Sequence, residues 1–186
     1  MVHGWGGSPE GGWFPWLKKE LEQRKFKAIV PKMPDTENPK IEEWVPFLKN
    51  VVGDADENTY FVGGSIGCQT ILRYLERLPE KIRIGGIIFV APWFNMFPEP
   101  IEEEGGTEIA KPWLETPIDT KKVLTHTDRI AAIFSDDDPF VPLTDAKIFK
   151  EKLKAKIIIE HGKGHFDDKK YPIILKAVLG LIKTKK

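Results

Sequence analysis

The chain has 186 residues, of which 41% are hydrophobic, and its 28 Lys plus Arg balance 28 Asp plus Glu. This length suits one domain with a sizeable core, and the apolar content excludes a disordered chain. The zero net charge gives no electrostatic reason to expect nucleic-acid or membrane partners. A single cysteine, no apolar run of roughly 20 residues and no signal-peptide pattern together lead us to expect a cytoplasmic protein.

Short apolar runs alternate with stretches of helical spacing along the chain. Apolar residues recur every four positions over 13–21 and at helical spacing over 41–48, 72–78, 146–153 and 171–182, which predicts helices there. The predicted strands are 27–30, 59–64, 85–91, 129–135 and 156–160, each rich in aliphatic residues as in strands buried on both faces. This alternation predicts an α/β fold with a mostly parallel sheet of about six strands and helices on both faces.

Residues 92–122 interrupt the alternation. They contain five prolines, two tryptophans and an acidic run, and they are long for an ordinary connection. Two interpretations stay open: a cap over a site, with a short helix of its own, or an irregular excursion without a role in binding. No repeat or linker divides the chain, so residues 1–186 are expected to form one domain.

The stretch "FVGGSIG" (61–67) places Ser65 where a predicted strand becomes a predicted helix. It matches the G-x-S-x-G nucleophile elbow, in which small neighbours let a strained turn hold the hydroxyl clear of the sheet. The N–H of Ile66 would then lie near a helix N-terminus, where it could meet a developing oxyanion. The alternative is a glycine-rich turn of a nucleotide-binding fold, but a G-x-G-x-x-G fingerprint and a Walker lysine are absent from the sequence.

Two further motifs follow strands in the order that the α/β-hydrolase triad requires, Ser, Asp, His. "SDDDPFVP" (135–142) brings carboxylates to the carboxyl edge of the sheet, but spacing leaves open which Asp, 137 or 138, faces inward. "HGKGHF" (161–166) presents imidazoles on a glycine loop. It does not match the zinc motif H-E-x-x-H, and we expect no metal.

"VHGWGGSP" (2–9) is a fourth motif, a His-Gly-x-x-Gly turn after a short apolar start. Turns of this kind supply a second oxyanion donor, which here would be the backbone N–H of Trp5. A simple glycine turn is the alternative. Only Met1 and Val2 precede His3, so the first strand is expected to be truncated.

These motifs resemble the retinoblastoma-binding-protein-nine family of small serine hydrolases. The resemblance runs through 11–23, 33–48, 58–76, 85–93, 130–142 and 162–166, and so covers most of the chain. It implies a compact α/β-hydrolase that lacks the leading antiparallel strands of larger relatives. By the pattern of the family, Ser65 is the nucleophile, Asp138 the triad acid and His165 the base.

Gly64 and the short start before His3 depart from the family pattern. Gly64 stands where the elbow often has His, which changes the wall of the site. The stretch "IGCQT" (66–70) lacks the Leu and Glu of a Leu-x-Cys-x-Glu motif, so retinoblastoma-type binding is not supported.

The functional prediction is hydrolysis of small carboxylic esters, or of amides or short peptides, through an acyl-enzyme and without a cofactor. The aromatic residues Trp5, Trp13, Trp93 and Trp113 could line an apolar site, although Trp13 is favoured as a core residue. A binding or scaffold protein on a hydrolase fold is the first alternative. A thiol enzyme that uses Cys68 is the second.

Overall fold

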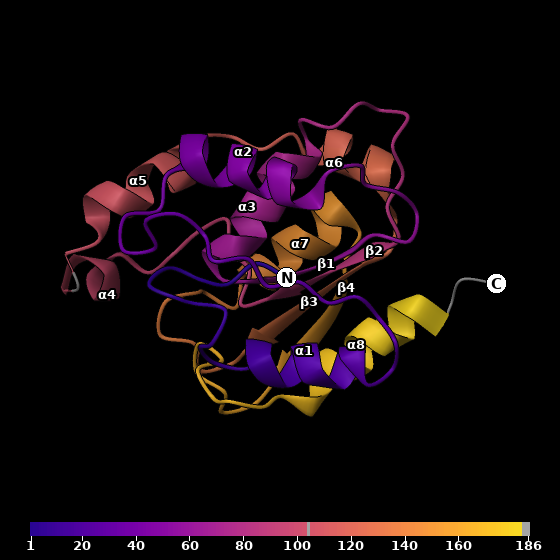
Figure 1. Ribbon diagram of the computed structural model, residues 1–186. Coiled ribbons are helices and arrows are strands. Elements are labelled where there is room, and N and C mark those ends of the chain that lie inside the picture. Colours follow the sequence, from indigo (N-terminus) through magenta and orange to yellow (C-terminus); the bar gives the residue numbers. More distant parts are fainter. Residues whose placement is uncertain (104, 184–186) are drawn as a thin grey trace.

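A parallel β-sheet forms the centre of the molecule in the computed structural model, which describes residues 1–103 and 105–183 (Figure 1). Its strands are β1 (Tyr60–Gly64), β2 (Gly86–Val90), β3 (Ile130–Ser135) and β4 (Lys156–Glu160), and their order in space equals their order in the chain. β1, β2 and β3 are buried almost throughout, whereas β4 at the edge is partly exposed. Such continuously apolar strands are typical of a sheet covered on both faces.

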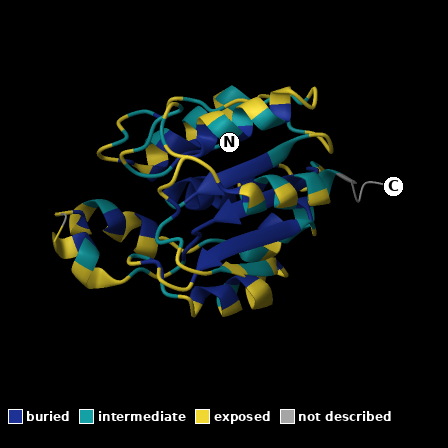
Figure 2. Ribbon diagram, turned by 90° about the horizontal axis from the view of Figure 1, so that it is seen from below, coloured by how far each residue is buried: buried dark blue, intermediate teal, exposed yellow. Residues whose placement is uncertain are grey.

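Helices cover both faces of this sheet and confirm the predicted α/β fold class. One layer contains α2 (Ile41–Val52), α3 (Ile66–Leu75), α6 (Thr120–His126) and α7 (Asp145–Leu153), and the other contains α1 (Phe14–Glu22) and α8 (Pro172–Lys183) (Figure 1). Each layer encloses its own apolar core against the sheet, and Figure 2 shows most of the sheet between them in the buried colour. No helix within the described ranges is both long and apolar enough to cross a bilayer.

The sheet has fewer regular strands than the six or so that the sequence predicts. Val2 forms one parallel bridge with Gly63, through Val2 N to Val62 O at 2.8 Å and Gly64 N to Val2 O at 3.0 Å. The chain enters a turn directly after Val2, so this pairing ends at one bridge. The prediction of a buried strand at 27–30 is wrong: this segment lies beside the N-terminus without a regular ladder, and Ile29 is 43% exposed.

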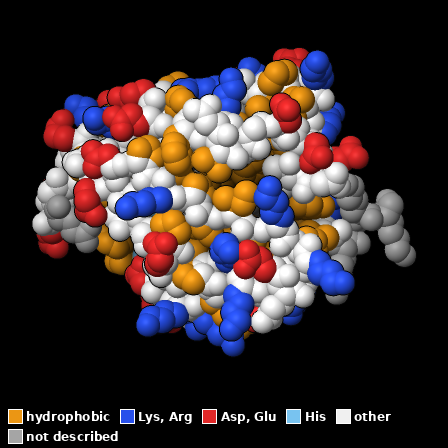
Figure 3. Space-filling view, viewed as in Figure 1, with side chains coloured by type: hydrophobic (Ala, Val, Ile, Leu, Met, Phe, Trp, Pro, Cys, Tyr) orange, Lys and Arg blue, Asp and Glu red, His pale blue; other side chains and the backbone are white. Residues whose placement is uncertain are grey.

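Residues 92–122 contain the first turn of α6 and two short helices, α4 (Pro98–Glu103) and α5 (Thr107–Glu115), which lie together at one end of the molecule (Figure 1). We call residues 92–115 the cap segment. On the face drawn in Figure 3, acidic and basic side chains are interspersed over the surface, in keeping with the balanced composition. The position of the cap segment becomes important for the site, because several of its side chains reach the same cavity as Ser65.

Candidate active site

Ser65 lies in a strained turn between β1 and α3. Its backbone has φ 50° and ψ −123°, a conformation that is costly for a residue with a side chain and is concentrated at functional sites. Ser65 N donates to Val90 O at 2.9 Å, which fixes the turn against the end of β2. The geometry is that of a nucleophile elbow, with the hydroxyl at the carboxyl edge of the sheet.

The glycines of the elbow are required by close approaches of backbone to backbone. A Cβ on Gly67 would lie 2.3 Å from the carbonyl oxygen of Val2, and a Cβ on Gly63 would lie 2.9 Å from Cys68 N. Neither space can hold a methyl group without displacing main chain. These two residues therefore let α3 pack directly on β1 and on the N-terminal segment, as the sequence predicts for crowding at this junction.

Gly64 faces a different environment, the aromatic side chains at the start of α1. A Cβ there would lie 3.2 Å from Phe14 and 3.3 Å from Trp13, whose rings stack with centroids 3.8 Å apart. Trp13 is 3% exposed and belongs to the second core, but it also lines the cavity that contains Ser65. The two interpretations of Trp13, core residue and cavity wall, are therefore compatible.

Asp138, which is buried, and His165, which is partly exposed, form an acid–base pair. The Nδ1 atom of His165 donates to the Asp138 carboxylate at 2.8 and 3.0 Å, and the Asp138 side chain is only 2% exposed. The same carboxylate accepts from Phe140 N at 2.9 Å and Val141 N at 3.0 Å, which fixes its orientation. With Nδ1 engaged in this way, a neutral His165 ring carries its free lone pair on Nε2.

The two preceding aspartates bind the histidine loop instead. Asp136 accepts from His161 Nδ1 at 2.6 Å, and this hydrogen bond lowers the pKa of Asp136 and raises the pKa of His161. Asp137 accepts from Ser135 Oγ at 2.6 Å and from Gly164 N at 2.8 Å, and both bonds lower its pKa. The three carboxylates thus point to different partners, and Asp138 is the one that faces His165.

Trp5 belongs to a tight turn beside the elbow. Gly7 N donates to Gly4 O at 3.1 Å, and Gly6 has φ 62°, so Gly4–Gly7 is a turn that needs glycine at its third position. A Cβ on Gly4 would lie 3.4 Å from the Cβ of Ser65. Within the described residues neither the N–H of Trp5 nor that of Ile66 has an acceptor, and Ile66 is the first residue of α3.

His3 is bonded to the first residue of this turn and is not part of the acid–base pair. It is 1% exposed, its Nδ1 donates to Gly4 O at 3.0 Å, and its Nε2 accepts from Met33 N at 3.3 Å. Burial lowers the pKa of His3, so the neutral ring that these two bonds require is the stable form near neutral pH.

One cavity of about 570 Å³ contains both Ser65 and His165. No hydrogen bond joins their side chains within residues 1–103 and 105–183, and contacts of this kind often tighten only when substrate binds. The apolar part of the wall comes from the Gly4–Gly7 turn, the start of α1 and the residue before it, the end of β2, the cap segment and the loops after β3 and β4: Trp5, Trp13, Phe14, Val90, Met96, Ile101, Ile109, Phe140 and Phe166. Within the same described ranges, no three His, Cys, Asp or Glu side chains are grouped so as to hold a metal ion.

Arg73 anchors the cap segment and was not identified from the sequence. It is 1% exposed on α3, and its Nη2 donates to Trp113 O and Thr116 O, each at 2.8 Å. These are carbonyls at the end of α5, which otherwise lack intrahelical partners. Burial lowers the pKa of Arg73 to about 10, so the guanidinium stays charged at neutral pH.

Asp145 is a second anchor that sequence patterns did not reveal. It is fully buried at the start of α7, and its carboxylate accepts from the main-chain N–H groups of Phe94 and Asn95 at 2.5 and 2.8 Å. The cap segment also contacts the loop after β3 that carries Asp138, since Phe97 N donates to Phe140 O at 2.9 Å. The segment is therefore tied to both α3 and α7 and is not a loose excursion.

Cys68 lies inside α3 and is completely buried. Its thiol donates to Val90 O at 3.5 Å, and burial raises its pKa well above the ordinary value. Because the thiolate is the reactive form, this environment disfavours the alternative of a thiol enzyme.

The comparisons with known proteins agree with this geometry. The family described as "Serine hydrolase" matches residues 1–172. The chain is 32% identical to YdeN of Bacillus subtilis (strain 168) over 167 residues, 89% of this chain and 84% of YdeN. It is 26% identical to the serine hydrolase RBBP9 of Rattus norvegicus over 172 residues, 92% of this chain and 87% of RBBP9.

The crystal structure of the ydeN gene product from Bacillus subtilis has the same fold. It superposes with a TM-score of 0.89 at 29% identity, and the match covers 98% of this chain and 97% of that chain. The family resemblance inferred from the sequence motifs is thereby confirmed. The chain belongs to the serine hydrolase family and is an enzyme with the α/β-hydrolase fold.

Proposed function

We propose that this enzyme hydrolyses small carboxylic esters through a Ser65-Asp138-His165 triad. The observation that carries the proposal is that the strained Ser65 turn and the Asp138–His165 pair open onto one cavity. We include in the proposal that residues 1–186 act as one domain, because the sheet and both helix layers contribute to that cavity or support it.

In the first step the Ser65 hydroxyl attacks the ester carbonyl carbon while His165 Nε2 takes its proton. Asp138 holds the ring in the tautomer that this transfer needs and stabilises the imidazolium that forms. The unpaired N–H groups of Trp5 and Ile66 donate to the oxyanion of the tetrahedral intermediate, each contributing about 3 kcal/mol. Collapse of that intermediate breaks the bond to the alcohol, which leaves with the proton from His165.

The second step returns the enzyme to its starting state. A water molecule gives a proton to His165 and attacks the acyl carbon, and the same two N–H groups stabilise the second oxyanion. The bond to Ser65 breaks, the serine regains its proton from His165, and the carboxylic acid departs. Every proton taken up in the cycle is returned, so the chemistry requires only substrate and water.

The walls of the cavity support an apolar acyl or aryl group on the substrate. Trp13 and Phe14 lie on one side, and Met96 and Ile101 of the cap segment also line the cavity. A volume of about 570 Å³ is in the range of sites for small molecules. Amides and short peptides are a second substrate class for the same triad, because the acylation chemistry is shared.

The test compares the native chain with Ser65→Ala, and with Cys68→Ala as the control for the other buried nucleophile. We expect a fluorophosphonate probe to label the native protein and Cys68→Ala, and 4-nitrophenyl acetate and butyrate to be hydrolysed by both. Ser65→Ala should lose labelling and turnover. If labelling and turnover survive in Ser65→Ala, the triad assignment is wrong; if the native chain shows neither, the binding or scaffold alternative is favoured.

A further inference from the structure

The indole of Trp5 connects the Gly4–Gly7 turn, which we call the oxyanion turn, to the cap segment. A Cβ on Gly106, the residue before α5, would lie 2.5 Å from Cη2 of Trp5 and 3.3 Å from both Cζ2 and Cζ3. Real Cβ atoms are essentially never closer than 3.0 Å to such a neighbour. The outer edge of the indole therefore rests on the main chain of Gly106, and a methyl group at Gly106 would have to displace that edge.

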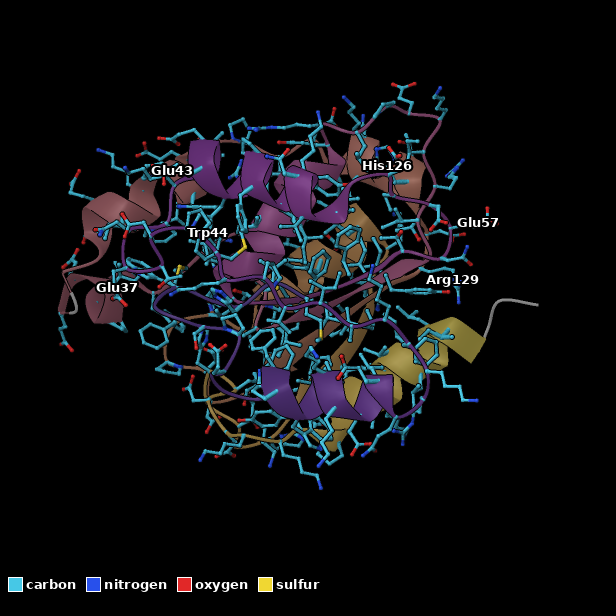
Figure 4. All side chains as sticks on the ribbon, in the orientation of Figure 1. Glu37, Glu43, Trp44, Glu57, His126 and Arg129 are labelled. Carbon is cyan, nitrogen blue, oxygen red and sulfur yellow. The ribbon has the colours of Figure 1, made fainter. Side chains whose placement is uncertain are left out.

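A second set of contacts holds the indole nitrogen and the main chain of the turn. The indole Nε1 donates to Glu37 O at 2.9 Å, and Gly6 N, next in the turn, donates to Thr36 O at 2.8 Å. Figure 4 labels Glu37 at the end of the molecule where α4 and α5 lie. Because the ring is rigid and bonded at Nε1, displacing its outer edge must strain that bond or move the main chain of Trp5.

The 34–39 loop is itself fixed by two tryptophans. Trp44 Nε1 donates to Pro34 O at 2.6 Å from α2, and Trp113 Nε1 donates to Pro39 O at 2.9 Å from α5. Trp113 lies on the helix whose last carbonyls accept from Arg73. The cap segment consequently reaches the oxyanion turn by two routes, directly through Gly106 and indirectly through this loop.

We propose that Gly106 is a positioning residue for the oxyanion hole: the cap segment, through Gly106 against the Trp5 indole, sets where the Trp5 N–H points. This inference rests on the proposed function, in which that N–H stabilises the oxyanion. It gives the cap segment a part in the chemical step as well as in lining the cavity. A misplacement of about 1 Å in catalytic groups can cost on the order of 100-fold in rate, so a methyl group at Gly106 should lower the turnover rate.

The central variant is Gly106→Ala. The backbone of Gly106 has φ −91° and ψ 0°, which alanine adopts without strain, so the variant tests the contact with Trp5 and not the turn conformation. We expect kcat for 4-nitrophenyl butyrate to fall about 10- to 100-fold with KM within about twofold. Binding of a trifluoromethyl ketone, which forms a tetrahedral adduct, should weaken by the same factor, while the pH midpoint of kcat/KM stays unchanged because Asp138–His165 is untouched.

The matched control is Gly180→Ala, which adds the same methyl group on α8 at a point where no other side chain or main chain among the described residues is found within 4 Å, the backbone of the helix itself aside. It should leave kcat at the native value. In a Trp5→Phe background the Gly106→Ala change should alter kcat by no more than about threefold, because phenylalanine lacks the outer ring edge that meets the new Cβ. This non-additivity is a result that general loosening of the cap segment would not produce.

The outcomes separate this inference from the proposed function. If folded Gly106→Ala keeps native kcat, or loses as much activity with Phe at position 5 as with Trp, the inference is overturned. If Gly106→Ala does not fold, Trp5→Phe alone is decisive: we expect a native-like melting temperature with lowered kcat and unchanged KM, and native kcat would overturn the inference. Hydrolysis that survives in Ser65→Ala overturns the proposed function itself, whatever the Gly106 variants do.

Discussion

Replacement of Asp138 by Asn tests the acid of the triad with almost no change of shape. The Oδ1 atom of Asp138 accepts from Phe140 N and Val141 N at 2.9 and 3.0 Å, and an asparagine oxygen can keep both bonds. Its amide group then faces Nδ1 of His165, which must accept instead of donate. The proton of a neutral ring moves to Nε2, so the atom that should receive the Ser65 proton is already protonated.

The expected loss follows from this change of tautomer. A tautomer reversal of this kind costs about 10⁴-fold in kcat, which corresponds to about 5 kcal/mol at 1.36 kcal/mol for each factor of ten. Asp137→Asn is the matched control, because its Oδ1 contacts to Ser135 and Gly164 survive in an amide and it does not touch His165. It should keep kcat within a few-fold of native.

The assay measures kcat for 4-nitrophenyl butyrate and the rate of fluorophosphonate labelling, with melting temperatures as the check on folding. Both rates should fall together in Asp138→Asn, because the same proton transfer limits both reactions. If Asp138→Asn keeps more than about a tenth of native kcat while Asp137→Asn loses it, the two aspartates have been assigned the wrong way round.

Three further predictions concern the elbow, an exposed ion pair and the buried thiol. Gly67→Ala should lower the melting temperature sharply and reduce soluble yield, because its Cβ would lie 2.3 Å from the main chain. Gly64→Ala should fold, because its Cβ would lie 3.2 Å from the nearest ring atom. Equal melting temperatures for the two variants would contradict the packing argument. The bond to Asp136 raises the pKa of His161 above 6.5 and lowers that of the carboxyl below 3.8. The contribution of His161 to the stability of the fold is therefore complete below about pH 6.5 and is lost as the pH rises through its raised pKa. The contribution of Asp136 to stability is present above about pH 3.8 and is lost as the pH falls through its lowered pKa. His161→Gln should accordingly lower the melting temperature most near pH 5 and hardly at all above about pH 8, and a pH-independent difference would exclude this linkage. Cys68 should resist iodoacetamide until the protein unfolds, and rapid alkylation of the folded enzyme would contradict its burial.

Local motifs allowed the sequence to predict the elbow and the fold class. The conformation of Ser65 is set by immediate neighbours, because Gly63 and Gly67 meet atoms of the adjoining strand and helix. By contrast, spacing could not choose between Asp137 and Asp138. Adjacent residues on a turn point in different directions, and the choice depends on Phe140, Val141 and His165 as hydrogen-bond partners, which the fold brings together.

Features that depend on distant parts of the chain were beyond the reach of sequence patterns. The helical pattern predicts Arg73 to be an exposed charged residue on an amphipathic helix. It is buried because carbonyl groups about 40 residues later in the chain accept its hydrogen bonds. The run at 27–30 has the composition of a strand, but its place at the margin of the sheet leaves it partly exposed and without a regular ladder. Periodicity reports which residues are apolar and not which neighbours will cover them.

A single helix, α3, fixes both proposed oxyanion donors relative to the nucleophile. Ile66 is its first residue, so that donor moves with the helix. Two contacts of α3 also hold Trp5. Gly67 packs against the main chain just before the turn that contains Trp5. Arg73 binds the end of α5, the helix that begins beside Gly106. Both routes therefore hold Trp5 relative to α3, one through Gly67 and one through the end of α5. Preorganised donors of this kind lower a barrier without having to rearrange during the reaction. In the proposed function, α3 thus supports the oxyanion site, although within the described residues the N-terminal segment contributes only one bridge to the sheet.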